Sequence, residues 1–132
     1  MNFMIGYNLL ALGDGIGGIA RYGFSLIATM AEMFPEKMFL VFLQKKCRFR
    51  FLQNNIKIHC LTFPVKSPML RRFCEAVKLK GILRTLNFKG LLHSVNNVIP
   101  PISGLKQVVT IHDLLWWADP CRFPWPKKVL KV

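Results

Sequence analysis

The sequence predicts an α/β protein with a parallel sheet, and three observations support that prediction. Short apolar runs alternate with longer segments of helical periodicity along most of the 132 residues. The run 38–43 is apolar throughout, which is typical of strands that helices cover on both faces. Hydrophobic residues make up 52% of the chain, enough for one core. We therefore expect a single Rossmann-like sheet flanked by helices.

The order of the elements follows from the positions of apolar runs and of helix or strand breakers. Strands are expected at residues 3–8, 38–43, 56–63, 90–94 and 107–111. The segment 9–16 should be a loop that becomes rich in glycine, and the basic segment 45–55 an irregular connection. Three prolines interrupt the residues after 113, and a further helix should begin near Lys127.

Two longer segments have the periodicity of helices. The first is expected at 18–33, because its few polar residues share one narrow stripe: Arg21, Ser25, Thr29 and Glu32. The second should begin at Ser67-Pro68, which supply an N-cap and a proline at the first helical position. It carries an apolar stripe of Met69, Leu70, Phe73 and Val77. Beyond Gly81 the apolar positions move to another face, which predicts a kink or an early stop.

The net charge of +13 is concentrated in the middle of the chain. Between Lys45 and Lys89 there are twelve basic residues and one acid, Glu75. Such a patch attracts polyanions, including anionic lipid and phosphorylated ligands. A solvated basic face is the alternative. No nucleic-acid-binding motif accompanies the charge, so we do not expect a nucleic-acid partner.

Other patterns argue against a membrane span and against a metal site. No uncharged apolar run reaches the ~18 residues of a transmembrane helix. The four cysteines are dispersed and form no CxxC pair, and the three histidines form no HxxxH pair. We therefore expect free thiols, no metal, and a cytoplasmic protein that could lie at the inner face of the membrane.

His112 and Asp113 directly follow the apolar run Val108 to Ile111, the last expected strand. That composition is typical of a strand covered on both faces. In open parallel sheets, ligands bind beyond the carboxyl ends of the strands. The pair is therefore the strongest site candidate among the histidines and acids of the chain.

A glycine-rich loop precedes the first helix. Gly13, Gly15 and Gly18 match GxGxxG in form, but the loop is longer than in a dinucleotide fingerprint. The acid expected at the end of the second strand is replaced by Lys45 and Lys46, which would suit the 2′-phosphate of NADP. Small residues at a helix N-terminus also offer backbone N–H groups to any phosphate, and a connection without a ligand is the alternative.

Three segments resemble those of family 4 glycosyltransferases. The segment 17–22, GGIARY, is similar to the family's GIGRY-like segment at the start of an apolar helix. The segment 92–101, LHSVNNVIPP, resembles HSPNYxLPP, and 108–114, VVTIHDL, resembles VVTIHDL of the family. The likeness runs through the chain in order. The chain differs from the family at Tyr7-Asn8-Leu9 and at Val95, both on the expected acceptor side.

The resemblance implies a retaining, metal-independent GT-B enzyme that uses a nucleotide-sugar. This chain would be the truncated N-terminal, acceptor-side domain over 1–132, without the C-terminal donor-binding domain. The family's glycine loop approaches the donor diphosphate, which implies that role for Gly17 and Gly18. Its histidine after the fifth strand contacts the donor sugar, which implies a catalytic role for His112. The acceptor would be a glycan or a lipid-linked sugar.

Further residues have two interpretations each. Arg21 could approach the donor phosphate or pair with an acid, Asp14 or Glu32. Asp113 could orient His112 or cap the following turn. Three residues after the fourth strand could bind acceptor hydroxyls, although asparagine is common in turns for backbone reasons: Ser94, Asn96 and Asn97.

Three other functions compete with the transferase. One is an inactive glycosyltransferase remnant without its own catalysis, and another is an NADP-dependent oxidoreductase domain. A basic nucleic-acid binder is the last. The residues do not identify the donor sugar, because the family's donor selectivity lies in the other domain.

Overall fold

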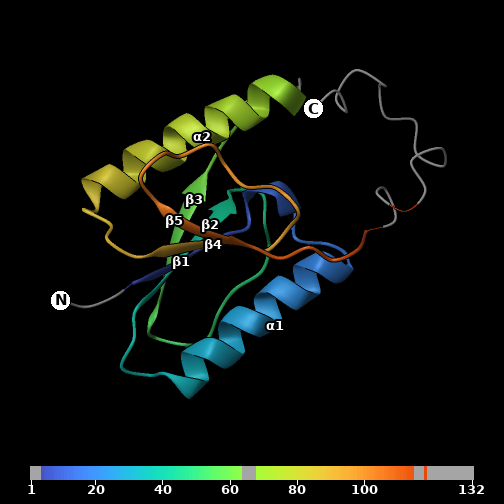
Figure 1. Cartoon of the computed structure of the whole chain (residues 1–132). Helices are drawn as coiled ribbons and strands as arrows, with labels where there is room; N and C mark the ends of the chain where they lie inside the picture. Colours follow the sequence, from blue (N-terminus) through green and yellow to red (C-terminus); the bar gives the residue numbers. More distant parts are fainter. Residues whose placement is uncertain (1–3, 64–67, 115–117, 119–132) are drawn as a thin grey trace.

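The computed structural model describes residues 4–63, 68–114 and 118 of the chain. Within them it has five strands, two α-helices and one 3-10 helix (Figure 1). The strands are β1 (Ile5–Asn8), β2 (Phe39–Gln44), β3 (Ile56–Leu61), β4 (Leu91–Ser94) and β5 (Lys106–Val109). The helices are η1 (Leu10–Leu12), α1 (Gly18–Met33) and α2 (Pro68–Thr85). Ser67, the later prolines and the helix expected near Lys127 lie outside the described residues.

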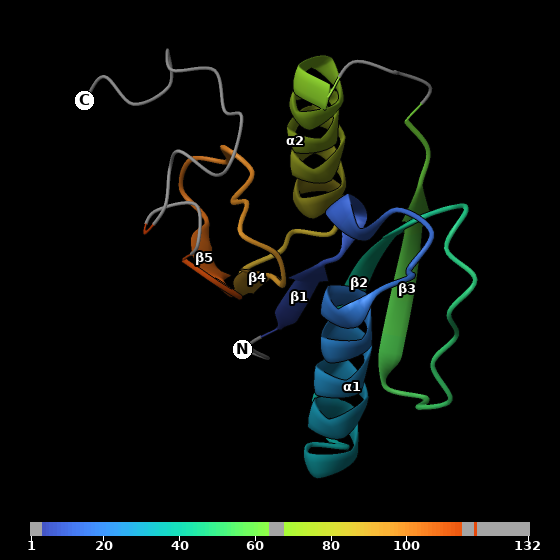
Figure 2. The same cartoon turned by 90° about the vertical axis from the view of Figure 1, so that its right-hand side faces the viewer.

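All five strands are parallel, in the order β3-β2-β1-β4-β5. Helix α1 covers one face of this sheet and α2 the other (Figure 2). The expected α/β class and parallel sheet are therefore confirmed. The chain places β2 and β3 on one side of β1 and then crosses to β4 on the other side. At such a change of direction, ligands usually bind beyond the carboxyl ends of the two strands, here β1 and β4. We call this position the crevice.

Helix α1 has the predicted bounds and packs tightly on the sheet. Its buried face includes Phe24 and Ile27, while the four residues of the predicted polar stripe are exposed. Gly23 lets the helix approach closely, because a β-carbon there would lie 3.1 Å from Val95 Cγ2 and 3.3 Å from Leu9 Cδ2. This contact fixes the start of α1 against the segment that follows β4.

Helix α2 corrects two expectations. Its apolar stripe faces solvent: Met69, Leu70, Phe73 and Val77 are 83%, 51%, 66% and 55% exposed. The helix instead buries Ala76, Leu79 and Leu83 against the sheet, and it runs through Gly81 to Thr85 without the predicted break. Glu75 hydrogen-bonds Asn8, the last residue of β1. The residues before Glu75 therefore extend past the carboxyl end of β1. Val77 comes after Glu75 and is exposed as well, because the stripe lies on a different face of the helix from Ala76, Leu79 and Leu83.

Strand β5 lies at an edge of the sheet, and its side chains are partly exposed. This exposure contradicts the prediction that helices cover both of its faces. It ends at Val109, two residues earlier than expected, and Val108 is 43% exposed. Ile111 is exposed as well. The apolar run is therefore weakly covered because of its place in the strand order, which composition does not reveal. Among the described residues, no helix has the length and apolar character needed to span a bilayer.

Candidate functional site

His112 is held by the segment that follows β4. Its ring Nε2 lies 2.6 Å from the carbonyl oxygen of Val95, and its backbone N–H donates to Asn97 Oδ1 at 3.1 Å. A carbonyl oxygen can only accept, so Nε2 carries the proton in this contact. In the neutral ring Nδ1 is therefore an acceptor, and it makes no hydrogen bond within the described part of the chain. That nitrogen can meet a ligand.

The ring of His112 also contacts the beginning of α1. The centroids of the His112 and Tyr22 rings are 5.1 Å apart, at an interplanar angle of 86°. Such an edge-to-face contact is favourable for aromatic rings. Tyr22 lies four residues beyond Gly18, which is about 6 Å along the helix axis. The structure thus brings the histidine to the same end of α1 as the two predicted phosphate-binding glycines.

The N-terminus of α1 is uncapped and faces open space. Gly17 has φ 111° and ψ 173°, a conformation that is essentially restricted to glycine. No side chain caps the helix, and its first turn contains no acid. A β-carbon on Gly17 or Gly18 would meet nothing within 4 Å. The N–H groups of the first turn have no intrahelical partner, so they can bind an anion.

The glycine loop itself lies against the end of β2. A β-carbon on Gly15 would lie 2.8 Å from Cys47 Sγ, and one on Gly13 would lie 3.5 Å from Lys46 Nζ. Both glycines have positive φ. The Gln44 amide donates to the Leu10 carbonyl and so ties the loop to the strand. These contacts hold the loop in a fixed conformation, and the Lys46 ammonium lies close to it.

Arg21 and Asp113 are exposed residues at this end of the sheet. Arg21 makes no ion pair with Asp14 or with Glu32, whose carboxylate instead accepts a hydrogen bond from Gln53 at 2.8 Å. Its guanidinium is therefore not held by the acids that the sequence offered as partners. Asp113 directly follows His112 and faces solvent.

Ser94 lies inside the protein, not on the surface of the crevice. It is 1% exposed, and its hydroxyl accepts from Asn8 Nδ2 at 3.4 Å. The same amide donates to Glu75 Oε1 at 3.3 Å, and Asn8 Oδ1 accepts the Leu10 N–H at 3.1 Å. These contacts join the carboxyl ends of β1 and β4 to α2. Ser94 therefore supports the floor of the crevice, where an acceptor cannot reach its hydroxyl directly.

The two asparagines expected to bind an acceptor differ in their placement. Asn97 is exposed, and its side-chain oxygen accepts the backbone N–H of His112. Asn96 is half-buried, and its carbonyl accepts the Val98 N–H at 2.6 Å in a tight turn. The segment after β4 thus positions His112 from two directions, through Val95 and Asn97.

His93 is packed in the sheet. Its Nε2 lies 2.8 Å from Thr110 Oγ1, and its ring lies 5.5 Å from that of Tyr7. Burial lowers the pKa of His93 below its usual range. The neutral ring therefore serves packing between β4 and the residue after β5.

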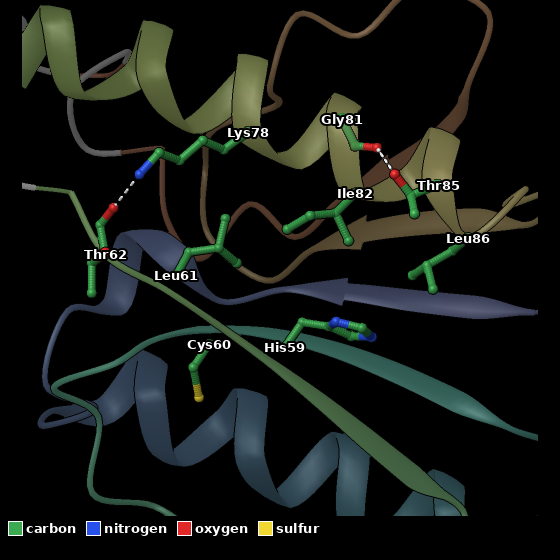
Figure 3. Close-up of a pocket in the computed structure, with 9 residues that line it drawn as sticks. All are labelled: His59, Cys60, Leu61, Thr62, Lys78, Gly81, Ile82, Thr85 and Leu86. Carbon is green, nitrogen blue, oxygen red and sulfur yellow. Dashed lines mark hydrogen bonds between the residues drawn. The ribbon is translucent and has the colours of Figure 1, made fainter.

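A separate hollow of about 550 Å³ lies between β3 and α2 (Figure 3). Lys78 at its rim donates to the Thr62 carbonyl at 2.7 Å and lies 5.3 Å from the Phe63 ring centroid. His59 stacks on Phe42, and its pKa is lowered first by burial and then by Lys57. None of the residues that line the hollow is a predicted site residue. It is distinct from the crevice at His112.

Two groups at the candidate site were not expected from the sequence: the Tyr22 ring and the Val95 carbonyl. Lys46 was expected to suit a 2′-phosphate, and the structure places its ammonium beside Gly13. The segment GGIARY contains Tyr22, but nothing in it predicts a contact with a histidine ninety residues later. Within the described ranges, no three histidine, cysteine, aspartate or glutamate side chains gather as metal ligands would.

The comparisons with known proteins found no relative of this chain. No protein-family model, curated protein or solved structure matches it. The likeness to family 4 glycosyltransferases therefore rests on its three sequence segments alone.

Proposed function

We propose that the chain is the acceptor-side half of a retaining GT-B glycosyltransferase. Its crevice, at the carboxyl ends of β1 and β4, would face a second lobe that binds most of a nucleotide-sugar donor. One observation carries the proposal: the His112 ring packs on Tyr22 at the open, uncapped N-terminus of α1. A diphosphate on the helix and a sugar beside the imidazole would therefore belong to one ligand.

The N-terminus of α1 would bind the donor diphosphate. A helix N-terminus carries about half a positive elementary charge. A β-carbon on Gly17 or Gly18 would meet nothing within 4 Å, so a ligand has room to approach this end of the helix. Lys46 beside the loop and Arg21 on the second turn would add positive charge. The first turn itself contains no acid that would repel an anion there.

His112 would contact the donor sugar through Nδ1. With Nε2–H engaged by the Val95 carbonyl, the neutral ring can accept a hydrogen bond from a sugar hydroxyl. A hydrogen bond placed there would stabilise the sugar as the donor bond breaks. Val95 would position the imidazole through its carbonyl, and Asn97 would position the backbone of His112.

Binding of UDP to the chain tests the phosphate role by calorimetry. Gly18→Pro removes one N–H at the first helical position, where proline is tolerated. Gly18→Ala keeps that N–H, and its β-carbon meets no neighbour. A hydrogen bond to a charged group contributes about 1.5–3 kcal/mol, so we expect UDP to bind Gly18→Pro about tenfold or more weakly than Gly18→Ala.

Equal affinities for the two variants would contradict the proposal.

An NADP titration in the same experiment tests the second candidate function, an NADP-dependent oxidoreductase domain, which Lys46 beside Gly13 favours. An oxidoreductase domain would bind NADP much more tightly than UDP, and a Lys46→Ala variant would lose that preference. A half-enzyme would bind both weakly through their shared diphosphate. An inactive remnant would keep the fold but show no difference between the Gly18 variants.

A further inference from the structure

We propose that the exposed face of α2 binds the surface of an anionic membrane. The apolar side chains Met69, Leu70, Phe73 and Val77 are each more than half exposed. At 100° per residue they span an arc of about 100° on the helix. Four large apolar residues on one face form an apolar patch of the kind that marks an interaction site.

The same arc becomes basic toward the C-terminal half of α2. Lys80 and Arg84 follow Phe73 by seven and eleven residues, close to whole turns of 3.6 residues. They therefore lie in line with the apolar side chains. Arg84 is exposed and Lys80 is partly exposed. The one acid of this helix, Glu75, is buried on the other side against Asn8.

This combination is complementary to anionic lipid. Interfacial helices bury apolar side chains at the boundary between headgroups and acyl chains, while basic side chains contact the headgroups. The arc has no acid, and the chain carries a net charge of +13. A second copy of the chain would bring like charges together at this face. Charge therefore favours a lipid surface over self-association.

The geometry of α2 would also orient the proposed site. Glu75 is hydrogen-bonded to the last residue of β1, so the part of α2 before it, which carries Met69, Leu70 and Phe73, lies beyond the carboxyl end of that strand. Figure 2 shows this end of α2 reaching past β1. The same end of the sheet carries His112. The membrane contact does not depend on sugar transfer. Only its consequence, delivery of a lipid-linked acceptor to the crevice, rests on the proposed function.

Co-sedimentation with vesicles tests this surface. The chain is expected to bind vesicles of equal parts phosphatidylcholine and phosphatidylglycerol, and to bind pure phosphatidylcholine far more weakly. Phe73→Ser with Leu70→Ser should weaken binding about tenfold or more, because two side chains no longer enter the lipid. Lys80→Glu with Arg84→Glu should weaken it at least about tenfold and reduce its dependence on salt.

The control variants make the same kinds of substitution at exposed positions outside α2. Leu52→Ser with Met33→Ser removes two apolar side chains that are 92% and 64% exposed, and Lys37→Glu with Arg48→Glu makes the same change in net charge. These variants should bind as the unmodified chain does.

The proposal would be overturned if all the variants bound the vesicles equally, or if the unmodified chain bound neither kind of vesicle. Light scattering that shows a dimer lost in the Phe73 variant would instead assign the face to a second copy. UDP binding would be unaffected in every case, so the two proposals fail separately.

Discussion

Gly90→Ala is expected to lower the free energy of unfolding by about 3 kcal/mol or more. A β-carbon at this position would lie 1.8 Å from the carbonyl oxygen of Met4 and 2.7 Å from its carbonyl carbon. That carbonyl accepts the Leu91 N–H at 3.1 Å, where β4 begins to pair with β1. The clash is with backbone, so the two central strands must separate to relieve it. Urea unfolding followed by circular dichroism measures the change.

Gly81→Ala is the matched control for that experiment. Gly81 lies within α2, and a β-carbon there meets nothing within 4 Å. Alanine at this position should therefore raise the free energy of unfolding by about 0.5–1 kcal/mol, through the higher helix propensity of alanine. If Gly90→Ala unfolds within 1 kcal/mol of the unmodified chain, the close approach of β1 and β4 described here is wrong.

His112→Ala is expected to lower the rate of sugar transfer about 100- to 1,000-fold, the cost of removing one preorganised group at a reacting centre. The measurement needs a protein in which this chain is joined to a donor-binding lobe. The change should appear in kcat, because the contact strengthens as the donor bond breaks. His112 is only half-buried, so the fold should persist, and the thermal unfolding curve would verify that.

Two further variants separate chemistry from positioning in the same assay. His59→Gln removes a histidine that stacks on Phe42 in the central sheet and lines the hollow beside α2, so turnover should not change. Asn97→Ala removes the acceptor of the His112 backbone N–H and should lower the rate to a smaller extent than His112→Ala. Turnover by His112→Ala equal to that of His59→Gln would remove the imidazole from the mechanism.

The sequence predicted the local elements well because their signals are local. The bounds of α1 follow from the glycines before it and from its polar stripe of Arg21, Ser25, Thr29 and Glu32. The start of α2 followed from Pro68, and the parallel sheet from the alternation of strands and helices. Strand order is not a local property. For that reason β5 was expected to be covered on both faces, although it lies at an edge.

The prediction of which side chains of α2 are buried was wrong for a similar reason. The spacing of Phe73 and Val77 gives a stripe, but the packing of the helix on the sheet decides which of its faces is buried. That packing buries Leu79 and Leu83 instead. The candidate site stays a prediction. The sequence singled out His112 and the glycines, but the ring contact with Tyr22 depends on β4 lying between β1 and β5, which the sequence did not reveal.

The claim on which the proposed function depends is that the N-terminus of α1 and the His112 imidazole bind one ligand. Nuclear magnetic resonance of the isotope-labelled chain during a UDP titration tests it directly. We expect one dissociation constant for two sets of signals that shift together: the amides of Gly17, Gly18 and Ile19, and the ring of His112. Shifts confined to the hollow around His59, or a His112 ring that does not respond while the glycine amides do, would contradict it.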